Sequence, residues 1–330
     1  RAVIFPGETM KTNSWSPATG RAFLLVGVLL ILALVIAGRA GLEGAAPRER
    51  MRGVCFVGGA PVDDSHLREL TGLGVEWISQ TPFGWQKNLD DVQVTLSAGG
   101  HASWGERAVG LRAASRLAHA NGMRTMLKPH IWLMDSDNSY WSGAITLDDE
   151  EDWSAWFASY QKFILHYARL AQEQGDGALC VGTELEGTTH RETEWRRIIA
   201  AIREVYDGPL TYAANWSGEF EQIEFWDALD FIGVQAYFPL SEEPDPDIDA
   251  LVEAWVPFRD RLAAVSARTG KRVAFTEVGY RSEPGAAIEP WLWSSQGPPD
   301  HITQANCYEA VFRALWNEPW FMGTFWWKWF

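Results

Sequence analysis

Residues 178–206 read ALCVGTELEGTTHRETEWRRIIAAIREVY and hold a pattern that recurs through most of the chain. Residues 178–183 form a short apolar run, which is typical of a buried parallel strand. Residues 190–206 instead place apolar side chains three and four positions apart and stop before Asp207-Gly208-Pro209, as an amphipathic helix does. This segment is therefore predicted to be one strand followed by one helix.

The same alternation extends outward in both directions. Helical patterns occupy residues 64–72, 105–120, 151–174, 248–269 and 302–317, with a weak one at 219–228. The other strand candidates are 53–58, 74–80, 124–131, 209–215, 230–237, 272–278 and 322–328. An open dinucleotide-binding sheet would carry a Gly-x-Gly-x-x-Gly turn after its first strand, and VGGAPVDDS lacks that spacing. We therefore expect a (β/α)8 barrel over residues 52–330, close to the usual size of about 250 residues.

The composition excludes some functions and favours others. A formal net charge of −15 argues against nucleic-acid binding, which needs clustered Lys and Arg. The chain has 19 Trp, whose flat apolar rings stack well on sugars, although we expect Trp153, Trp156, Trp195 and Trp316 to lie in the core. Three widely spaced Cys form neither a disulfide framework nor a metal motif, and we expect them to be buried.

The N-terminal part, residues 1–51, reads as a targeting segment and linker. Residues 22–38 (AFLLVGVLLILALVIAG) carry no charge and follow Arg21. The run is slightly short for a spanning helix, which needs about 20 residues, and slightly long for a signal core. It is either a cleaved signal or an uncleaved anchor that inserts into the membrane at least transiently. In both cases we expect an exported barrel that is secreted, periplasmic or anchored to the membrane.

Two carboxylates follow predicted strands directly. Glu184 comes after CVGT and Glu277 after VAFT. Catalytic groups of such barrels lie at the C-terminal ends of strands, so the two are expected at one edge. Either residue alone could instead be a buried ion pair or a loop cap, and Glu186 is an alternative to Glu184. The occurrence of Glu184 and Glu277 at two predicted strand ends favours a catalytic pair.

Further polar and aromatic residues are expected at this edge as substrate contacts: Trp85, Lys128, His130, Trp132, Asn215, Trp216, Tyr237, Trp326 and Lys328. His130 could bind substrate or orient a neighbour, and Lys128 could pair with a carboxylate or a sugar hydroxyl. A metal site is not expected, because no second His lies at a ligand spacing. The last strand candidate ends at residue 328, so either the eighth helix is absent or the sequence is a fragment.

From about residue 52 to the C-terminus the chain resembles glycoside hydrolase family 113, endo-acting β-mannanases of the retaining clan A. The segments that carry the resemblance are WISQTPFGWQ, MLKPHIWL, VGTELEGTTHRETEWRRII, LTYAANW, FIGVQAYFPL, FTEVGYRS and FWWKWF. The resemblance implies Glu184 as acid/base and Glu277 as nucleophile. It also implies a hydrogen bond from Tyr237 to the nucleophile, a polysaccharide or oligosaccharide substrate and no cofactor.

The chain departs from the wider clan at one position. Thr183 stands where the clan usually has an Asn before the acid/base residue, which places the contact to the sugar 2-hydroxyl in question. A retaining mechanism needs carboxyls about 5–5.5 Å apart.

Two other functions are alternatives to an endo-β-mannanase. The chain could be a hydrolase of another β-linked polysaccharide or a non-catalytic carbohydrate-binding barrel.

Overall fold

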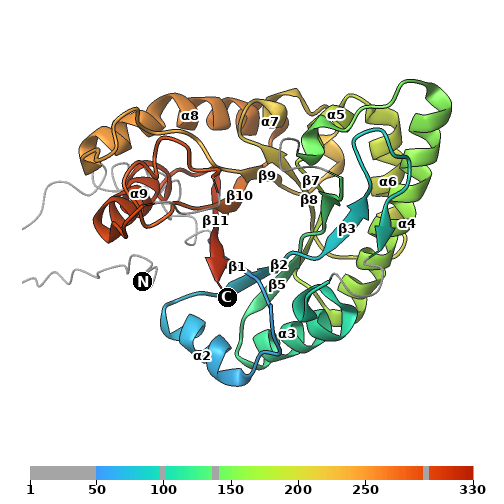
Figure 1. The fold of residues 1–330 in the computed structure, drawn as a ribbon, viewed down its shortest axis with the longest axis horizontal. Helices are drawn as coiled ribbons and strands as arrows, with labels where there is room; N and C mark the ends of the chain where they lie inside the picture. Colours follow the sequence, from blue (N-terminus) through green and yellow to red (C-terminus); the bar gives the residue numbers. More distant parts are fainter. Residues whose placement is uncertain (1–49, 97–101, 136–140, 293–296, 330) are drawn as a thin grey trace, which may run out of the picture. The chain divides into compact units, whose positions relative to one another are not determined.

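Eight parallel strands close into a barrel (Figure 1) in the computed structural model, which describes residues 50–96, 102–135, 141–292 and 297–329. In the order of pairing the barrel runs β1-β11-β10-β9-β8-β7-β5-β2. The strands are β1 (Met51–Phe56), β2 (Trp77–Gln80), β5 (Arg124–Leu127), β7 (Ala178–Thr183), β8 (Leu210–Asn215), β9 (Ile232–Gln235), β10 (Val273–Val278) and β11 (Phe321–Trp329). The expected (β/α)8 barrel is confirmed. The apolar run at 22–38 lies outside the described residues.

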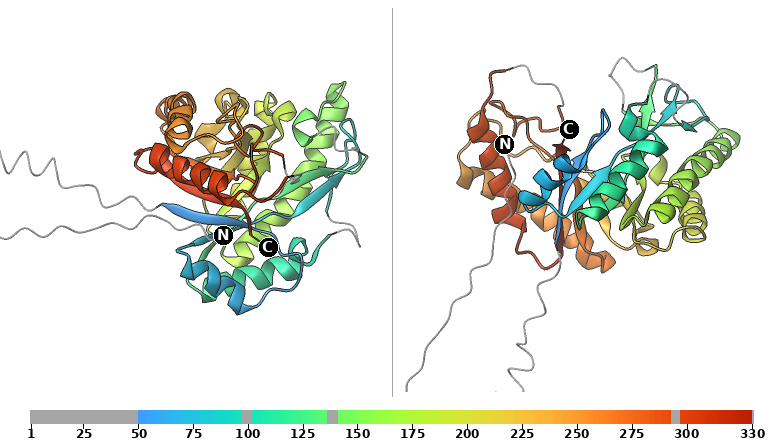
Figure 2. Two further views of the ribbon diagram at one scale, coloured as in Figure 1. Left: turned by 60° about the vertical axis from the view of Figure 1, so that its left-hand side comes forward. Right: turned by 90° about the horizontal axis from the view of Figure 1, so that it is seen from below.

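Helices surround the barrel in all the views (Figure 2). They are α2 (Asp64–Gly72), α3 (Ala108–Ala120), α4 (Glu150–Gln174), α5 (Glu186–Thr189), α6 (Glu192–Arg203), α7 (Glu219–Gln222), α8 (Ile248–Thr269) and α9 (His301–Leu315). Short 3-10 turns lie at Trp104–Glu106, Ser142–Ala144 and Trp226–Ala228. Within the described part of the chain, no helix is both long and apolar enough to cross a membrane.

The start of α4 shows how the sequence sets a helix end. The Asp149 side chain accepts a hydrogen bond of 2.9 Å from the backbone N–H of Asp152. Glu150, Glu151 and Asp152 fill the first turn, where negative charge interacts favourably with the helix dipole. The helix ends at Gly175, which takes the left-handed conformation.

The barrel interior is filled by a small apolar cluster at its base. Its members lie on the barrel strands or beside them, and none is on a helix: Met51, Cys55, Trp77, Met126, Ala178, Phe231, Ala274 and Phe325. Gly53 makes room for Phe325, since a Cβ there would lie 2.4 Å from the ring. Trp327 of β11 is partly buried and packs against this cluster.

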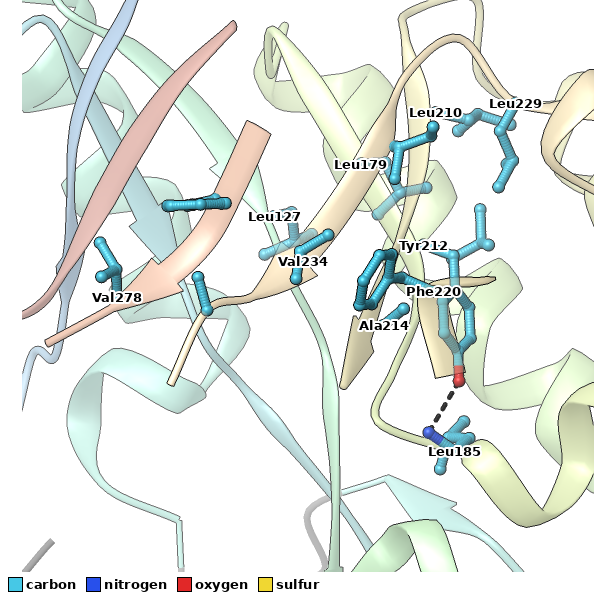
Figure 3. Packing of buried hydrophobic residues seen from close by; sticks show 14 of the residues in the cluster. Leu127, Leu179, Leu185, Leu210, Tyr212, Ala214, Phe220, Leu229, Val234 and Val278 are labelled. Carbon is cyan, nitrogen blue, oxygen red and sulfur yellow. Dashed lines mark hydrogen bonds between the residues drawn. The ribbon is translucent and has the colours of Figure 1, made fainter. Parts of the chain in front are cut away.

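The larger part of the core lies between the strands and the helices. Phe220 of α7 lies on one side of β8. Figure 3 shows Leu210, Tyr212 and Ala214 of the strand pointing to that side. Trp153, Trp156 and Trp195 are buried in this layer, as the helical periodicity predicts. Trp316 is only partly buried, at the edge of the same cluster.

A small second sheet was not evident from the sequence. It consists of β3 (Phe83–Gln86), β4 (Thr95–Leu96) and β6 (His130–Leu133), in the order β4-β3-β6. The single strand expected at 124–131 is in fact two, because β5 ends at Leu127 and β6 begins at His130. Pro129 between them has no N–H to continue the ladder. The break directs β6 into pairing with β3, where Phe83 lies opposite His130.

The alternation of side chains along β11 corrects one sequence prediction. Phe325 and Trp327 pack with the cluster inside the barrel. Trp326 points outward and is 2% exposed, with its ring centroid 4.3 Å from that of Tyr308 on α9. The prediction that Trp326 contacts substrate is therefore wrong. The adjacent Trp327 lies on the inner face of the strand together with Phe325.

Trp326→Ala is accordingly expected to lower the free energy of unfolding by about 3–5 kcal/mol, because it empties a packed site against α9. Urea unfolding followed by circular dichroism measures the change. Trp132→Ala is the matched control, since Trp132 is 45% exposed and its loss should cost about 0.5 kcal/mol or less. Equal stability of the two variants would contradict this placement of Trp326.

Candidate active site

Glu184 and Glu277 come from different strands of the barrel at the same edge. Glu277 is on β10, opposite Gln235 of β9, and is almost completely buried. Glu184 directly follows β7, and its backbone N–H donates to the carbonyl of Ala213 on β8 at 2.9 Å. The sequence prediction that both carboxylates lie at the C-terminal ends of strands is confirmed.

Glu277 is held by two donors. The ammonium of Lys128, which is completely buried at the end of β5, forms an ion pair with Oε1. The hydroxyl of Tyr237 donates to Oε2 at 2.7 Å, which is the contact that the resemblance implies. Burial by itself would raise the pKa of Glu277, but the charge of Lys128 and the two hydrogen bonds hold the pKa below its usual value of 4.5. Glu277 is therefore an anion at neutral pH.

His130 faces the same carboxylate. Its Nε2 lies 3.5 Å from Oε1 of Glu277, and its ring lies against Phe83. Burial and the charge of Lys128 lower the pKa of His130 to about 3. The imidazole is thus neutral at pH 7, so the positive charge beside Glu277 comes from Lys128.

Glu184 has the opposite electrostatic surroundings. Burial, followed by the negative charge of Glu277, raises the pKa of Glu184 to about 7. The Nδ2 group of Asn215 donates to its Oε1 at 2.7 Å. Glu186, the alternative carboxylate, is the first residue of α5 rather than a strand-end group. The site therefore presents one carboxylate and one carboxylic acid over a wide pH range.

Thr183 does not take the place of the amide that it replaces. Its hydroxyl donates to the carbonyl of Pro129 at 3.1 Å and is buried. The amide beside Glu184 comes instead from Asn215, at the end of the neighbouring strand β8. Asn215, one of the predicted site residues, is therefore the amide that contacts Glu184.

Aromatic side chains lie above two different arcs of the barrel. On the arc of β2 and β5, Trp132 is exposed, lies opposite Trp85 in the small sheet and packs edge-on against Phe83. On the arc of β8 to β10, Trp216 stacks on Trp291 with a centroid distance of 5.2 Å and an interplanar angle of 15°. Trp291 was not predicted from the sequence, because it lies in a loop outside any strand or helix pattern.

Two cations lie near the ring of Trp327 on the inner face of β11. Lys128 Nζ lies 6.0 Å from the ring centroid of Trp327, and Lys328 Nζ lies 5.0 Å from it. Lys328 is exposed near the end of β11, at the edge of the barrel where the sequence analysis expects substrate contacts. The Trp327–Lys328 peptide bond is cis.

In the described ranges, no cluster of three or more His, Cys, Asp or Glu side chains could hold a metal ion. Cys55, Cys180 and Cys307 are buried thiols, as expected.

Comparison with known proteins gives a consistent picture. The β-mannanase AaManA of glycoside hydrolase family 113 from Alicyclobacillus acidocaldarius, in complex with ManMIm, is 31% identical, with 85% of this chain and 87% of that chain covered and a TM-score of 0.74. Another family 113 β-1,4-mannanase structure is 25% identical, with 85% and 89% covered and a TM-score of 0.73. A Ruminococcus gnavus β-glucuronidase shares only the fold, at 15% identity, with 85% and 44% covered and a TM-score of 0.58.

No curated protein shows significant similarity to the chain. The sequence model of one family matches residues 60–330, which include every strand of the barrel after β1 and both glutamates. With that match and with the strand-end carboxyls in place, the chain belongs to glycoside hydrolase family 113.

Proposed function

We propose that this chain is a retaining endo-β-1,4-mannanase in which Glu277 is the nucleophile and Glu184 the acid/base. One observation carries the assignment of roles. Two carboxyls at the C-terminal ends of β7 and β10 have pKa values shifted in opposite directions, below the usual value for Glu277 and to about 7 for Glu184. Double displacement needs such a pair, one ionised and one protonated.

The first step would use both groups at once. The Glu277 carboxylate attacks the anomeric carbon while Glu184 gives its proton to the departing glycosidic oxygen, which leaves with the bonding electron pair. The products are a glycosyl ester on Glu277 and a released saccharide whose former glycosidic oxygen is now a hydroxyl group. Lys128 and Tyr237 support this step by keeping Glu277 ionised.

The second step reverses the role of Glu184. Once Glu277 is an ester, its negative charge no longer raises the pKa of Glu184, so the acid becomes a better base. Glu184 then takes a proton from water as the oxygen attacks the anomeric carbon and Glu277 leaves as a carboxylate. Two displacements on opposite faces return the sugar to the β-configuration.

Mannan is the proposed substrate because the most similar structures compared above are β-mannanases of the same family. Endo-action is supported by the two groups of aromatic residues, Trp132 on one arc and Trp216 with Trp291 on another. Stacking platforms on separate arcs allow sugar units to extend to both sides of the cleaved bond. Trp85, His130, Asn215 and Lys328 are proposed as further substrate contacts.

We also propose that residues 22–38 direct the barrel out of the cytoplasm. The support is the sequence alone: an uncharged apolar run after Arg21, followed by a polar linker. Basic residues before such a run favour a cytoplasmic N-terminus and an external barrel.

The purified enzyme is expected to release reducing sugars fastest from mannan or glucomannan and much more slowly from cellulose and xylan. Glu277→Ala should abolish turnover, and azide should restore it on an activated aryl glycoside by replacing the nucleophile. Glu184→Gln should slow substrates with poor leaving groups by about 10²–10⁴-fold while largely sparing the first step for dinitrophenyl glycosides. Proton NMR should show the β-anomer of the product first.

Glu186→Gln is the control for these variants, since Glu186 begins α5 and should retain activity. An α-anomer as first product would show inversion and overturn the mechanism. Faster hydrolysis of cellulose or xylan than of mannan would leave the mechanism intact but assign the enzyme to another β-linked polysaccharide.

The pH dependence follows from the two shifted groups. As the pH falls through the pKa of Glu277, below 4.5, the nucleophile is protonated and kcat/KM is lost. As the pH rises through about 7, Glu184 loses its proton and kcat/KM for poor leaving groups falls again. Asn215→Ala removes a hydrogen bond that lowers the pKa of Glu184, so the alkaline limb should move to higher pH. An equally steep alkaline limb on dinitrophenyl glycosides would exclude Glu184 as its source.

The location proposal is tested in cells that express the full chain. Protease added to intact spheroplasts should degrade the barrel, and deletion of residues 22–38 should protect it. N-terminal sequencing of the exported form then distinguishes a cleaved signal from a retained anchor. A barrel that resists protease in intact spheroplasts with the run present would place it in the cytoplasm.

A further inference from the structure

We infer that Glu219 is a positioning residue for Glu184, which it holds through the backbone of the neighbouring strand ends. The inference rests on the proposed role of Glu184 as acid/base. Glu219 is the first residue of α7, does not reach the cleft in its described contacts and is completely buried. It therefore acts through other residues, along two routes.

The first route runs through β8. Oε2 of Glu219 accepts a hydrogen bond of 2.6 Å from the backbone N–H of Asn215. The side chain of Asn215 in turn donates to Oε1 of Glu184 at 2.7 Å. The carboxyl thus fixes the backbone of the residue whose amide touches the acid/base.

The second route runs through Tyr212. The Tyr212 hydroxyl donates to Oε1 of Glu219 at 2.5 Å and accepts from the backbone N–H of Leu185 at 2.7 Å, the bond drawn in Figure 3. The Tyr212 ring is itself fixed in the core, edge-on to Trp195 at 5.3 Å. Leu185 directly follows Glu184, so this route ends one residue from the acid/base.

The conformation of Glu184 explains why such a support is needed. With φ at 49°, Glu184 is the one non-glycine residue in the left-handed region among those that the structure describes. The left-handed backbone conformation is energetically unfavourable for a residue with a Cβ, and it persists only where the surrounding structure holds it. The turn also removes the buried N–H of Leu185 from a regular ladder, and Tyr212 supplies its acceptor.

A carboxylate suits position 219 because two donors from separate groups must be met by two acceptor oxygens. Burial raises the pKa of Glu219 to about 8, whereas the hydrogen bonds from Asn215 and Tyr212 favour the ionised form and lower it. A glutamine would offer one acceptor and place an NH2 group against a donor. Glu221, two residues later on the same helix, provides the contrast: it lies at the surface and pairs with Arg261. Burying a carboxyl lowers the stability of the fold. The support that Glu219 gives to Glu184 through Asn215 and Tyr212 explains why a carboxyl is buried at this position.

The experiment compares phenyl and 2,4-dinitrophenyl β-mannobiosides, because only the poor phenolic leaving group needs a well-placed acid. For Glu219→Gln and Tyr212→Phe, kcat/KM on the phenyl substrate should fall about 10- to 100-fold, part of the ~10²–10⁴-fold from acid catalysis. On the dinitrophenyl substrate it should change by less than about threefold, since departure there needs no acid. Glu221→Gln is the matched control and should change neither rate more than about twofold, as an exposed ion pair contributes little.

Equal losses on both substrates would overturn the inference, because a merely structural role lowers both rates together. Loss of folding in both Glu219→Gln and Tyr212→Phe, seen by circular dichroism, would also overturn it. Glu184→Gln is assayed in parallel to separate the two proposals. If that variant shows no dependence on the leaving group, the proposed function fails; if it does and the Glu219 and Tyr212 variants do not, only this inference fails.

Discussion

The ion pair between Lys128 and Glu277 is the interaction on which the site depends. Both groups are buried, and an unpaired charge there would be strongly unfavourable. The pair lies above the apolar base of the barrel and is completed by the Tyr237 hydroxyl on Glu277 and by Gln235, whose Oε1 lies 3.4 Å from Lys128 Nζ. Lys128 thereby fixes the charge state of Glu277, and the charge of Glu277 in turn raises the pKa of Glu184.

The charge states of the two glutamates differ because their neighbours differ. Glu277 forms an ion pair with Lys128 at the end of β5 and accepts a hydrogen bond from the hydroxyl of Tyr237 after β9. Glu184 instead accepts a hydrogen bond from the neutral amide of Asn215 at the end of β8. This asymmetry is possible because a barrel brings the ends of strands distant in sequence to one rim. The same negative charge that favours a protonated Glu184 before glycosyl transfer disappears when Glu277 becomes an ester. The electrostatic coupling therefore suits both halves of a double displacement.

The sequence predicts the parts of this arrangement that follow from periodicity. The eight strands are found within a few residues of their expected positions, and Glu184 and Glu277 are recognisable because each directly follows an apolar run. The phase of β11 was not predictable, since FWWKWF contains Trp at adjacent positions and the pattern does not show which faces inward. Trp291 was missed because it lies in a loop. The small sheet was missed because Pro129 interrupts what looks like one strand.

Glu219 illustrates a different limit of sequence reasoning. In the stretch SGEFEQ it resembles a solvated helix start, and nothing local distinguishes it from Glu221. The difference arises only when the C-terminal ends of β7 and β8 meet and leave two backbone N–H groups, those of Leu185 and Asn215, without ladder partners. A local irregularity, the left-handed residue at Glu184, creates the need for an acceptor on a neighbouring element. Residues that support an active-site conformation in this way are specified by the geometry of the fold rather than by any motif around them.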